Sequence, residues 1–220
     1  MPSQLPKEIQ ESACEVMKAG IKALGIHLGC AKGDIKITKD GPKIGELAAR
    51  LSGGFMSAYT YPLSTGVNLM RAAIEIALGQ EPGNLEPLYN RVAIERAIIT
   101  KPGIVKKICG VEEALKIPGI AEIFITVKPG DKVKKPTSNV EKAGHIIAVA
   151  DTLEEAEEAV RKCKEIINIE ICDESELSMD TIYISARERL RKVCYVCKHC
   201  NGKDCASGVP GMGGIGSGAS

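Results

Sequence analysis

The chain has 220 residues, 44% hydrophobic and 26% charged, which is the composition of an ordinary soluble globule. A net charge of +1, two Phe, five Tyr and no Trp argue against a nucleic-acid-binding surface, which needs clustered positive charge and aromatic platforms. No apolar run approaches the roughly 20 residues that span a bilayer, and residues 1–20 lack the apolar segment of a signal peptide. Nine cysteines without a secretion signal indicate a reducing compartment, so we expect a cytoplasmic protein.

The first two predicted elements are a helix and a hairpin. From Pro6 to Leu24, apolar residues recur at steps of three and four, which predicts an amphipathic helix. Cys14 lies beside the apolar stripe, and we expect it in the core. Two short apolar runs then flank Lys39-Asp40-Gly41, and this pattern predicts a β-hairpin because Gly41 can adopt the positive φ that the loop needs.

The register of this hairpin decides its chemistry. A three-residue loop, Lys39–Gly41, sets Asp34 opposite Glu46, with their Cβ atoms about 5 Å apart. Such a pair is destabilising unless a cation lies between the carboxylates, and magnesium held by acids and substrate phosphates suits the geometry. The alternatives are a surface hairpin with solvated acids, or a two-residue loop Asp40-Gly41 that separates the acids onto opposite faces. In the favoured register, one face carries Asp34, Lys36, Ile44 and Glu46, and the other carries Ile35, Ile37 and Leu47.

The next element is a helix, followed by a loop that we take as a boundary. Ser64-Thr65 is expected to cap the helix and Gly79 to end it. The loop runs from Glu81 to Asn90, and it places domains at 1–84, 85–173 and 174–220. The expected buried face of the helix comprises Val67, Met70, Ile74, Ala77 and Leu78.

From Arg91 the pattern changes to short strands rich in Ile and Val. Thr152 and Glu155 form a capping box for a helix whose apolar stripe includes Cys163. We expect His145, at the start of a strand, to be hydrogen-bonded rather than catalytic, and the segment 132–139 to be a basic loop without core positions. Strands are predicted at 92–100, 104–108, 120–127, 144–150 and 169–171, with a short helix at 111–117.

The C-terminal segment is rich in cysteine and glycine after a basic helix predicted at 180–192. Four cysteines are spaced by two, two and four residues: Cys194, Cys197, Cys200 and Cys205. This spacing lets thiolates converge on one ion or cluster, so an iron–sulfur cluster or Zn²⁺ is one interpretation. A reduced tail without metal is the other.

The hairpin resembles the metal-binding segment of the ATP-grasp ligases, in which an acid is followed twelve positions later by Glu-x-Asn-Pro-Arg. Asp34 stands at the first acid, Glu46 at the second and Arg50 at the arginine, while Ala48-Ala49 replaces Asn-Pro. The resemblance covers roughly residues 4–171 and points to the carboxylate–amine ligases. It implies an α+β fold class: the C-terminal part of an ATP-grasp fold, a small α/β C-terminal domain and an irregular tail.

The resemblance also implies a site and a reaction. ATP and Mg²⁺ would be the cofactors, and a small carboxylic acid would be phosphorylated and then captured by an amine. Asp34 and Glu46 would hold magnesium, and Arg50 would contact phosphate or the substrate carboxylate. The residues expected to contact nucleotide or substrate are Lys32, Lys36, Gly53 and Gly54.

In such ligases the lobe that supplies most nucleotide contacts precedes this segment, and only residues 1–24 stand before Gly25 here. We therefore expect the chain alone to bind Mg-ATP weakly and to turn over little. A separate chain carrying the missing lobe could complete the site, or the chain could be a non-catalytic metal-binding module. The tail, with Cys-x-x-Cys-x-x-Cys-Asn-Gly and Pro-Gly-Met-Gly-Gly, resembles the start of certain FMN-dependent α-hydroxy-acid dehydrogenases, but flavin binding is not implied for this chain.

Overall fold

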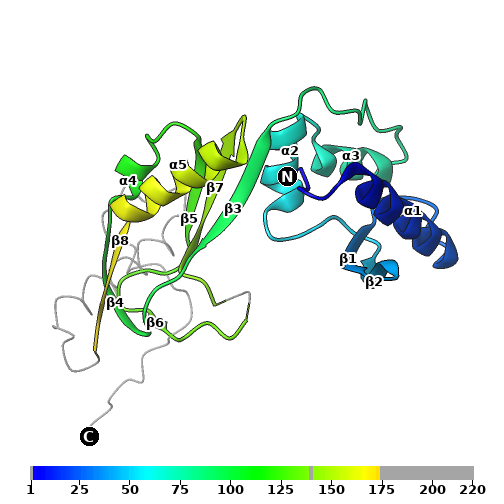
Figure 1. Ribbon diagram of the computed structural model, residues 1–220. Coiled ribbons are helices and arrows are strands. Elements are labelled where there is room, and N and C mark those ends of the chain that lie inside the picture. Colours follow the sequence, from blue (N-terminus) through cyan, green and yellow to red (C-terminus); the bar gives the residue numbers. More distant parts are fainter. Residues whose placement is uncertain (1, 139–140, 174–220) are drawn as a thin grey trace, which may run out of the picture.

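The computed structural model describes residues 2–138 and 141–173 (Figure 1). The helix predicted at 180–192 and the cysteines Cys194, Cys197, Cys200 and Cys205 lie outside the described residues. Across the described ranges, every helix is too short or too polar to cross a bilayer. The fold is mixed α and β with antiparallel sheets, as the α+β prediction required.

The N-terminal unit consists of α1 (Lys7–Ala23) packed on a hairpin of β1 (Lys32–Thr38) and β2 (Gly41–Ala48). Gly20 allows the close approach, because a Cβ there would lie 2.6 Å from Ile44 Cδ1. The predicted helix is confirmed, but α1 has no buried residue. Cys14 is exposed, so the prediction that it lies in the core is wrong: its position beside the stripe falls outside the contact with the hairpin.

Three short helices follow the hairpin: the π-helix η1 (Met56–Thr60), α2 (Tyr61–Thr65) and α3 (Leu69–Ala77). The predicted cap at Ser64-Thr65 is wrong, because Gly66 ends α2 at φ 80° and the Asn68 side chain then caps α3 by accepting from the Arg71 N–H at 2.9 Å.

The break at Gly66 also changes which face of α3 is covered. Val67 and Ala72 are buried, whereas Met70, Ile74 and Leu78 are 48%, 60% and 69% exposed. Ala77 is exposed as well. The predicted buried face is therefore correct only at Val67.

The C-terminal unit contains two antiparallel sheets and two helices (Figure 1). Six strands and two helices make up this unit: β3 (Val92–Ile98), β4 (Gly103–Cys109), α4 (Val111–Ala114), β5 (Ile120–Ile125), β6 (Lys132–Val133), β7 (Gly144–Ala150), α5 (Leu153–Ile166) and β8 (Asn168–Cys172). The strand orders are β3-β7-β5 and β6-β4-β8. All the predicted strands are present, and β6 corrects the expectation that 132–139 is loop throughout, because Lys132 and Val133 pair with β4.

The core lies between the β3-β7-β5 sheet and α5. Ile146 and Cys163 are fully buried there, as expected for Cys163. The capping box at Thr152 and Glu155 is confirmed, with the Glu155 N–H donating to Thr152 Oγ1 at 3.2 Å. Because strand side chains alternate, the residues between the core positions point to the opposite face of the sheet. That face meets the segment that begins at Phe55.

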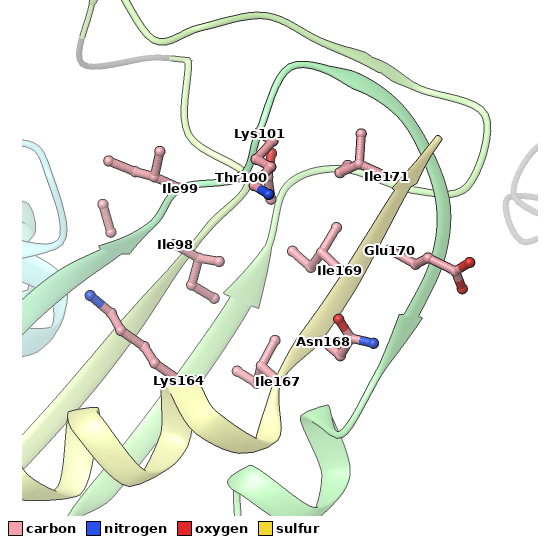
Figure 2. A pocket seen from close by; sticks show the side chains of 11 residues that line it. Ile98, Ile99, Thr100, Lys101, Lys164, Ile167, Asn168, Ile169, Glu170 and Ile171 are labelled. Atoms are coloured by element: carbon pink, nitrogen blue, oxygen red, sulfur yellow. The ribbon is translucent and has the colours of Figure 1, made fainter. Parts of the chain in front are cut away.

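A cavity of about 590 Å³ lies between the end of β3 and β8, with Ile98 on one strand and Ile169 on the other (Figure 2). Thr100 also lines it, and its hydroxyl oxygen is buried without a hydrogen-bond partner among the described residues. A buried hydroxyl that loses its bonds to water and gains none in the protein costs about 1–3 kcal/mol. Thr100 is therefore a weak point of this unit.

We predict that Thr100→Val raises the free energy of unfolding by about 1 kcal/mol, since it removes the unpaired hydroxyl and keeps the shape. The matched control is Thr65→Val, because the Thr65 hydroxyl donates to Tyr61 O at 2.8 Å and accepts from the Val67 N–H at 3.2 Å. The free energy of unfolding of Thr65→Val should fall by about 1 kcal/mol, because these hydrogen bonds are lost. Urea unfolding measures both, and a loss of stability at Thr100 would contradict the prediction.

Candidate functional site

The hairpin brings Asp34 opposite Glu46, as predicted, but its loop length and its register differ from the prediction. Thr38 pairs with Gly41, so the loop is Lys39-Asp40, and both the three-residue loop and the alternative Asp40-Gly41 are wrong. A β-bulge beside Asp34 adds one residue to β2 before Glu46 and shifts the pairing by one. The two acids therefore share a face despite the shorter loop.

The same bulge corrects the predicted faces of β2. Ile44 pairs with Ile35, and its Cδ1 atom lies against Gly20 of α1. Ile44 therefore belongs to the apolar face and not to the face of the acids, where it had been expected. The bulge lets β2 present an isoleucine to the helix and, two residues later, a carboxylate to the other side.

A cation lies between the two acids, and it is the ammonium group of Lys32. Lys32 Nζ is 2.7 Å from Asp34 Oδ2 and 3.0 Å from Glu46 Oε1. The hydrogen bonds that it donates, first to Asp34 and then to Glu46, raise the pKa of Lys32 above its ordinary value. The Lys32 side chain is 14% exposed, whereas those of Asp34 and Glu46 are 64% and 54% exposed. The carboxylates thus face solvent while the ammonium lies beneath them.

Arg50 adds a second positive charge, and Lys36 does not join the cluster. Arg50 Nη2 lies 3.7 Å from Glu46 Oε1, four residues along the chain, as predicted. Lys36 is exposed and lies opposite Lys43, and in the described part of the chain it forms no ion pair with either acid. The structure therefore brings together four of the predicted site residues: Lys32, Asp34, Glu46 and Arg50.

The donor set suits a hard divalent cation that also binds phosphate. Two carboxylates converge on one point, and magnesium sites commonly use one or two carboxylates with phosphate oxygens and water. Among the described residues no group of three or more His, Cys, Asp or Glu side chains forms a complete protein cage. A metal here would need ligands from a bound molecule, and Lys32 would have to move aside.

The segment after Arg50 has an unusual backbone. Gly53 and Gly54 are exposed, and Gly54 has φ 60°. Phe55 follows with φ 65° and ψ 2°, and within residues 2–138 and 141–173 it is the one non-glycine residue with positive φ. This conformation costs a residue with a side chain about 1–2 kcal/mol. It persists only where the surroundings hold it.

Aromatic packing holds Phe55 in place. Its ring stacks on Phe124 of β5 with centroids 4.7 Å apart at 17° and lies 4.7 Å from the ring of His145 on β7. His145 Nδ1 is in turn 2.6 Å from Glu95 Oε1 on β3, so the expectation of a hydrogen-bonded His145 is confirmed. This cluster was not predicted from the sequence, although the chain has only two phenylalanines and they stack on each other.

Comparison with known proteins shows that this chain is similar to parts of several ligases. Residues 96–171 match the family model of L-amino acid ligase C-terminal domain 2. L-amino acid ligase from Bacillus licheniformis has a similar structure, with a TM-score of 0.67, 27% identity, and coverage of 78% of this chain and 43% of that chain. Phosphoribosylglycinamide synthetase from Anaerococcus prevotii shares the fold, with a TM-score of 0.71, 22% identity, and coverage of 78% and 44%.

One relative at the sequence level is the uncharacterized protein y4rH of Sinorhizobium fredii. It is 28% identical over 177 residues, which cover 80% of this chain and 37% of that protein. The chain thus spans less than half the length of these relatives.

The chain is similar in fold to the C-terminal region of carboxylate–amine ligases of the ATP-grasp kind, the resemblance that the sequence predicted. Within that class, the C-terminal unit is similar to domain 2 of the L-amino acid ligases.

We predict that Asp34→Asn lowers the pKa of Lys32 toward 10.5, and lowers it more than Glu46→Gln does, because the hydrogen bond to Asp34 is the largest cause of the shift. The ion pairs stabilise the folded chain below that ordinary pKa, and their contribution is lost as pH rises through the higher folded pKa. NMR titration of the Lys32 side chain measures this. Asp40→Asn, at the tip of the hairpin, is the control, and an equal effect there would contradict the assignment.

Proposed function

We propose that this chain supplies the metal- and phosphate-binding hairpin of an ATP-dependent ligase that joins a small carboxylic acid to an amine. The observation that carries the proposal is the convergence of Asp34 and Glu46 on one cation position with Arg50 beside it. Phosphoryl transfer depends mainly on positioning and on neutralising charge, and these are the parts it requires.

Each residue of the hairpin would have a separate role in binding the metal, the phosphate groups or the substrate. Asp34 and Glu46 would hold Mg²⁺, which supplies neutralisation of the phosphate charge when bound. Lys32, displaced from the carboxylates, would pair with a phosphate oxygen, with Lys36 as a second and more distant cation. Arg50 would contact phosphate or the substrate carboxylate. Gly53 and Gly54 are exposed, and their backbone N–H groups would contact the same anions.

The reaction that we propose proceeds through an acyl phosphate. A carboxylate oxygen of the acid attacks the γ-phosphorus of ATP, and ADP leaves. The amine then attacks the acyl carbon, inorganic phosphate leaves, and the nitrogen loses a proton. The cations of the hairpin act on the first step, because negative charge gathers on the phosphoryl oxygens there.

We further propose that another lobe, on a separate chain or in sequence beyond this one, covers the N-terminal unit. Two observations support this. Met70, Ile74 and Leu78 form an exposed apolar stripe on α3 at steps of four, and α1 contributes no buried residue. Such a stripe is typical of a helix face that packs against a partner.

The alternative, an iron–sulfur or Zn²⁺ module, rests on cysteines outside the described residues. No structural observation favours it, so the ligase remains our proposal. We also propose a cytoplasmic location on the argument from the cysteines.

The test is Mn²⁺ binding to the full chain in the presence of ADP, followed by electron paramagnetic resonance. Mn²⁺ prefers oxygen ligands, so the cysteines should contribute little. We expect one site whose dissociation constant rises about tenfold or more in Asp34→Asn and in Glu46→Gln, since each removes a charged ligand. Lys32→Met should bind Mn²⁺ more tightly when ADP is absent, because the competing ammonium is gone.

Asp40→Asn is the matched control, because Asp40 is an exposed acid on the same hairpin outside the cluster. It should bind Mn²⁺ within about twofold of the natural chain. If Asp34→Asn and Glu46→Gln bind Mn²⁺ as the natural chain does, the metal site is not at this hairpin and the proposed function loses its basis.

A further inference from the structure

A second cavity, of about 740 Å³, lies between the segment that starts at Gly54 and the face of the β3-β7-β5 sheet that is opposite α5. Its volume is in the range of small-molecule sites. The residues that matter for its chemistry are Phe55, Met56, Glu95, Thr126, Lys142 and His145. Asp34 and Glu46 do not line it. We propose that this cavity binds a small carboxylate with an apolar side chain, and that Lys142 pairs with the carboxylate.

Lys142 provides the charge. Its side chain is half-buried, and within the described residues no carboxylate pairs with it. The acids nearby are already engaged. Glu95 contacts His145, Glu157 contacts Arg96, and Glu141 accepts from the N–H and the hydroxyl of Thr137 at 2.6 and 2.8 Å. A half-buried lysine without a counter-charge favours an anionic ligand, because burial of an unpaired charge is unfavourable.

The backbone of Lys142 is fixed at the entrance to β7. Thr126 Oγ1 donates to Lys142 O at 2.6 Å, and the Thr126 N–H donates to Ala143 O at 3.0 Å. Gly144, two residues later, begins the strand that carries His145. The ammonium therefore extends from a rigid position and not from the middle of a loop, which reduces the entropy that is lost when it binds.

Phe55 and Met56 supply the apolar wall. Phe55 keeps the left-handed backbone described above because its ring packs on Phe124 and His145. Met56 is 42% exposed, and its flexible thioether suits side chains of varied shape. Strained residues cluster at ligand-binding sites, where the surroundings hold them in place. The strained backbone of Phe55 and the unpaired Lys142 are independent observations, and both residues line the same cavity.

Glu95 and His145 form the polar part of the wall. Their side chains are 23% and 15% exposed, so they are shielded but still accessible from the cavity. The 2.6 Å contact between Glu95 Oε1 and His145 Nδ1 engages the Glu95 carboxylate with a partner other than Lys142. Arg96 also lines the cavity but is paired with Glu157, so among the described lining residues Lys142 is the cation without a carboxylate partner.

This inference deepens the proposed function, because it assigns a binding place to a substrate carboxylate other than the one that attacks ATP. In that respect it rests on the proposed function. The binding event itself requires neither ATP nor metal, so it can be tested separately.

The experiment uses the full chain without nucleotide or metal and compares 3-phenylpropanoate with its neutral analogue 3-phenylpropan-1-ol. Amide NMR spectra report the site and the affinity. We expect the carboxylate to shift the signals of Phe55, Lys142 and His145. We expect it to bind about tenfold more tightly than the alcohol, which is the contribution of one charge-assisted contact. Lys142→Gln should remove that advantage, and Lys142→Arg should retain most of it.

Lys128→Gln is the matched control, because Lys128 is a half-buried lysine of the same connection that does not line the cavity. It should leave binding unchanged. Equal affinity for acid and alcohol, equal weakening by Lys128→Gln and Lys142→Gln, or no binding at millimolar concentrations would each overturn the inference. Carboxylate binding without a Mn²⁺ site at Asp34 and Glu46 would sustain the inference and contradict the ligase, and the reverse result would do the opposite.

Discussion

Two carboxylates on neighbouring strands repel each other unless a positive charge lies between them, and the hairpin is built around this constraint. Lys32 supplies the charge from beneath, while Asp34 and Glu46 remain open to solvent. The ammonium group therefore keeps the pair stable in the chain as it stands. Under the function proposed above, a divalent cation bound with phosphate would meet two acids that already converge, and the Lys32 ammonium would lie beside them.

The second constraint joins this site to the C-terminal unit. The two phenylalanines of the chain stack across the boundary between the units. In this arrangement Phe55 has an unfavourable left-handed backbone conformation. His145 packs against the same ring and is held by Glu95. The orientation of Gly53-Gly54, three and four residues after Arg50, is thus determined partly by strands that lie far along the sequence.

The periodic segments were predictable, and the local exceptions were not. The strands after Arg91 and the helix capped by Thr152 follow from alternation and capping chemistry, which act within a few residues. The bulge in β2 was not predictable from local pattern, and it accompanies a contact between Ile44 and Gly20 of a separate helix. The stack of Phe55 on Phe124 was missed for a similar reason, since it joins residues almost seventy positions apart.

The burial pattern also implies that the N-terminal helix and hairpin resist local unfolding less than the C-terminal unit does. None of α1, β1 and β2 contains a buried residue, whereas the C-terminal unit contains fully buried residues on β7, β4 and α5, among them Ile146, Val105 and Cys163. Amide hydrogens of the hairpin should therefore exchange through low-energy openings that leave the C-terminal unit intact. A ligand that binds only the closed hairpin would slow that exchange in proportion to its occupancy. The segment that carries the acids is thus the one whose order responds most to what it binds.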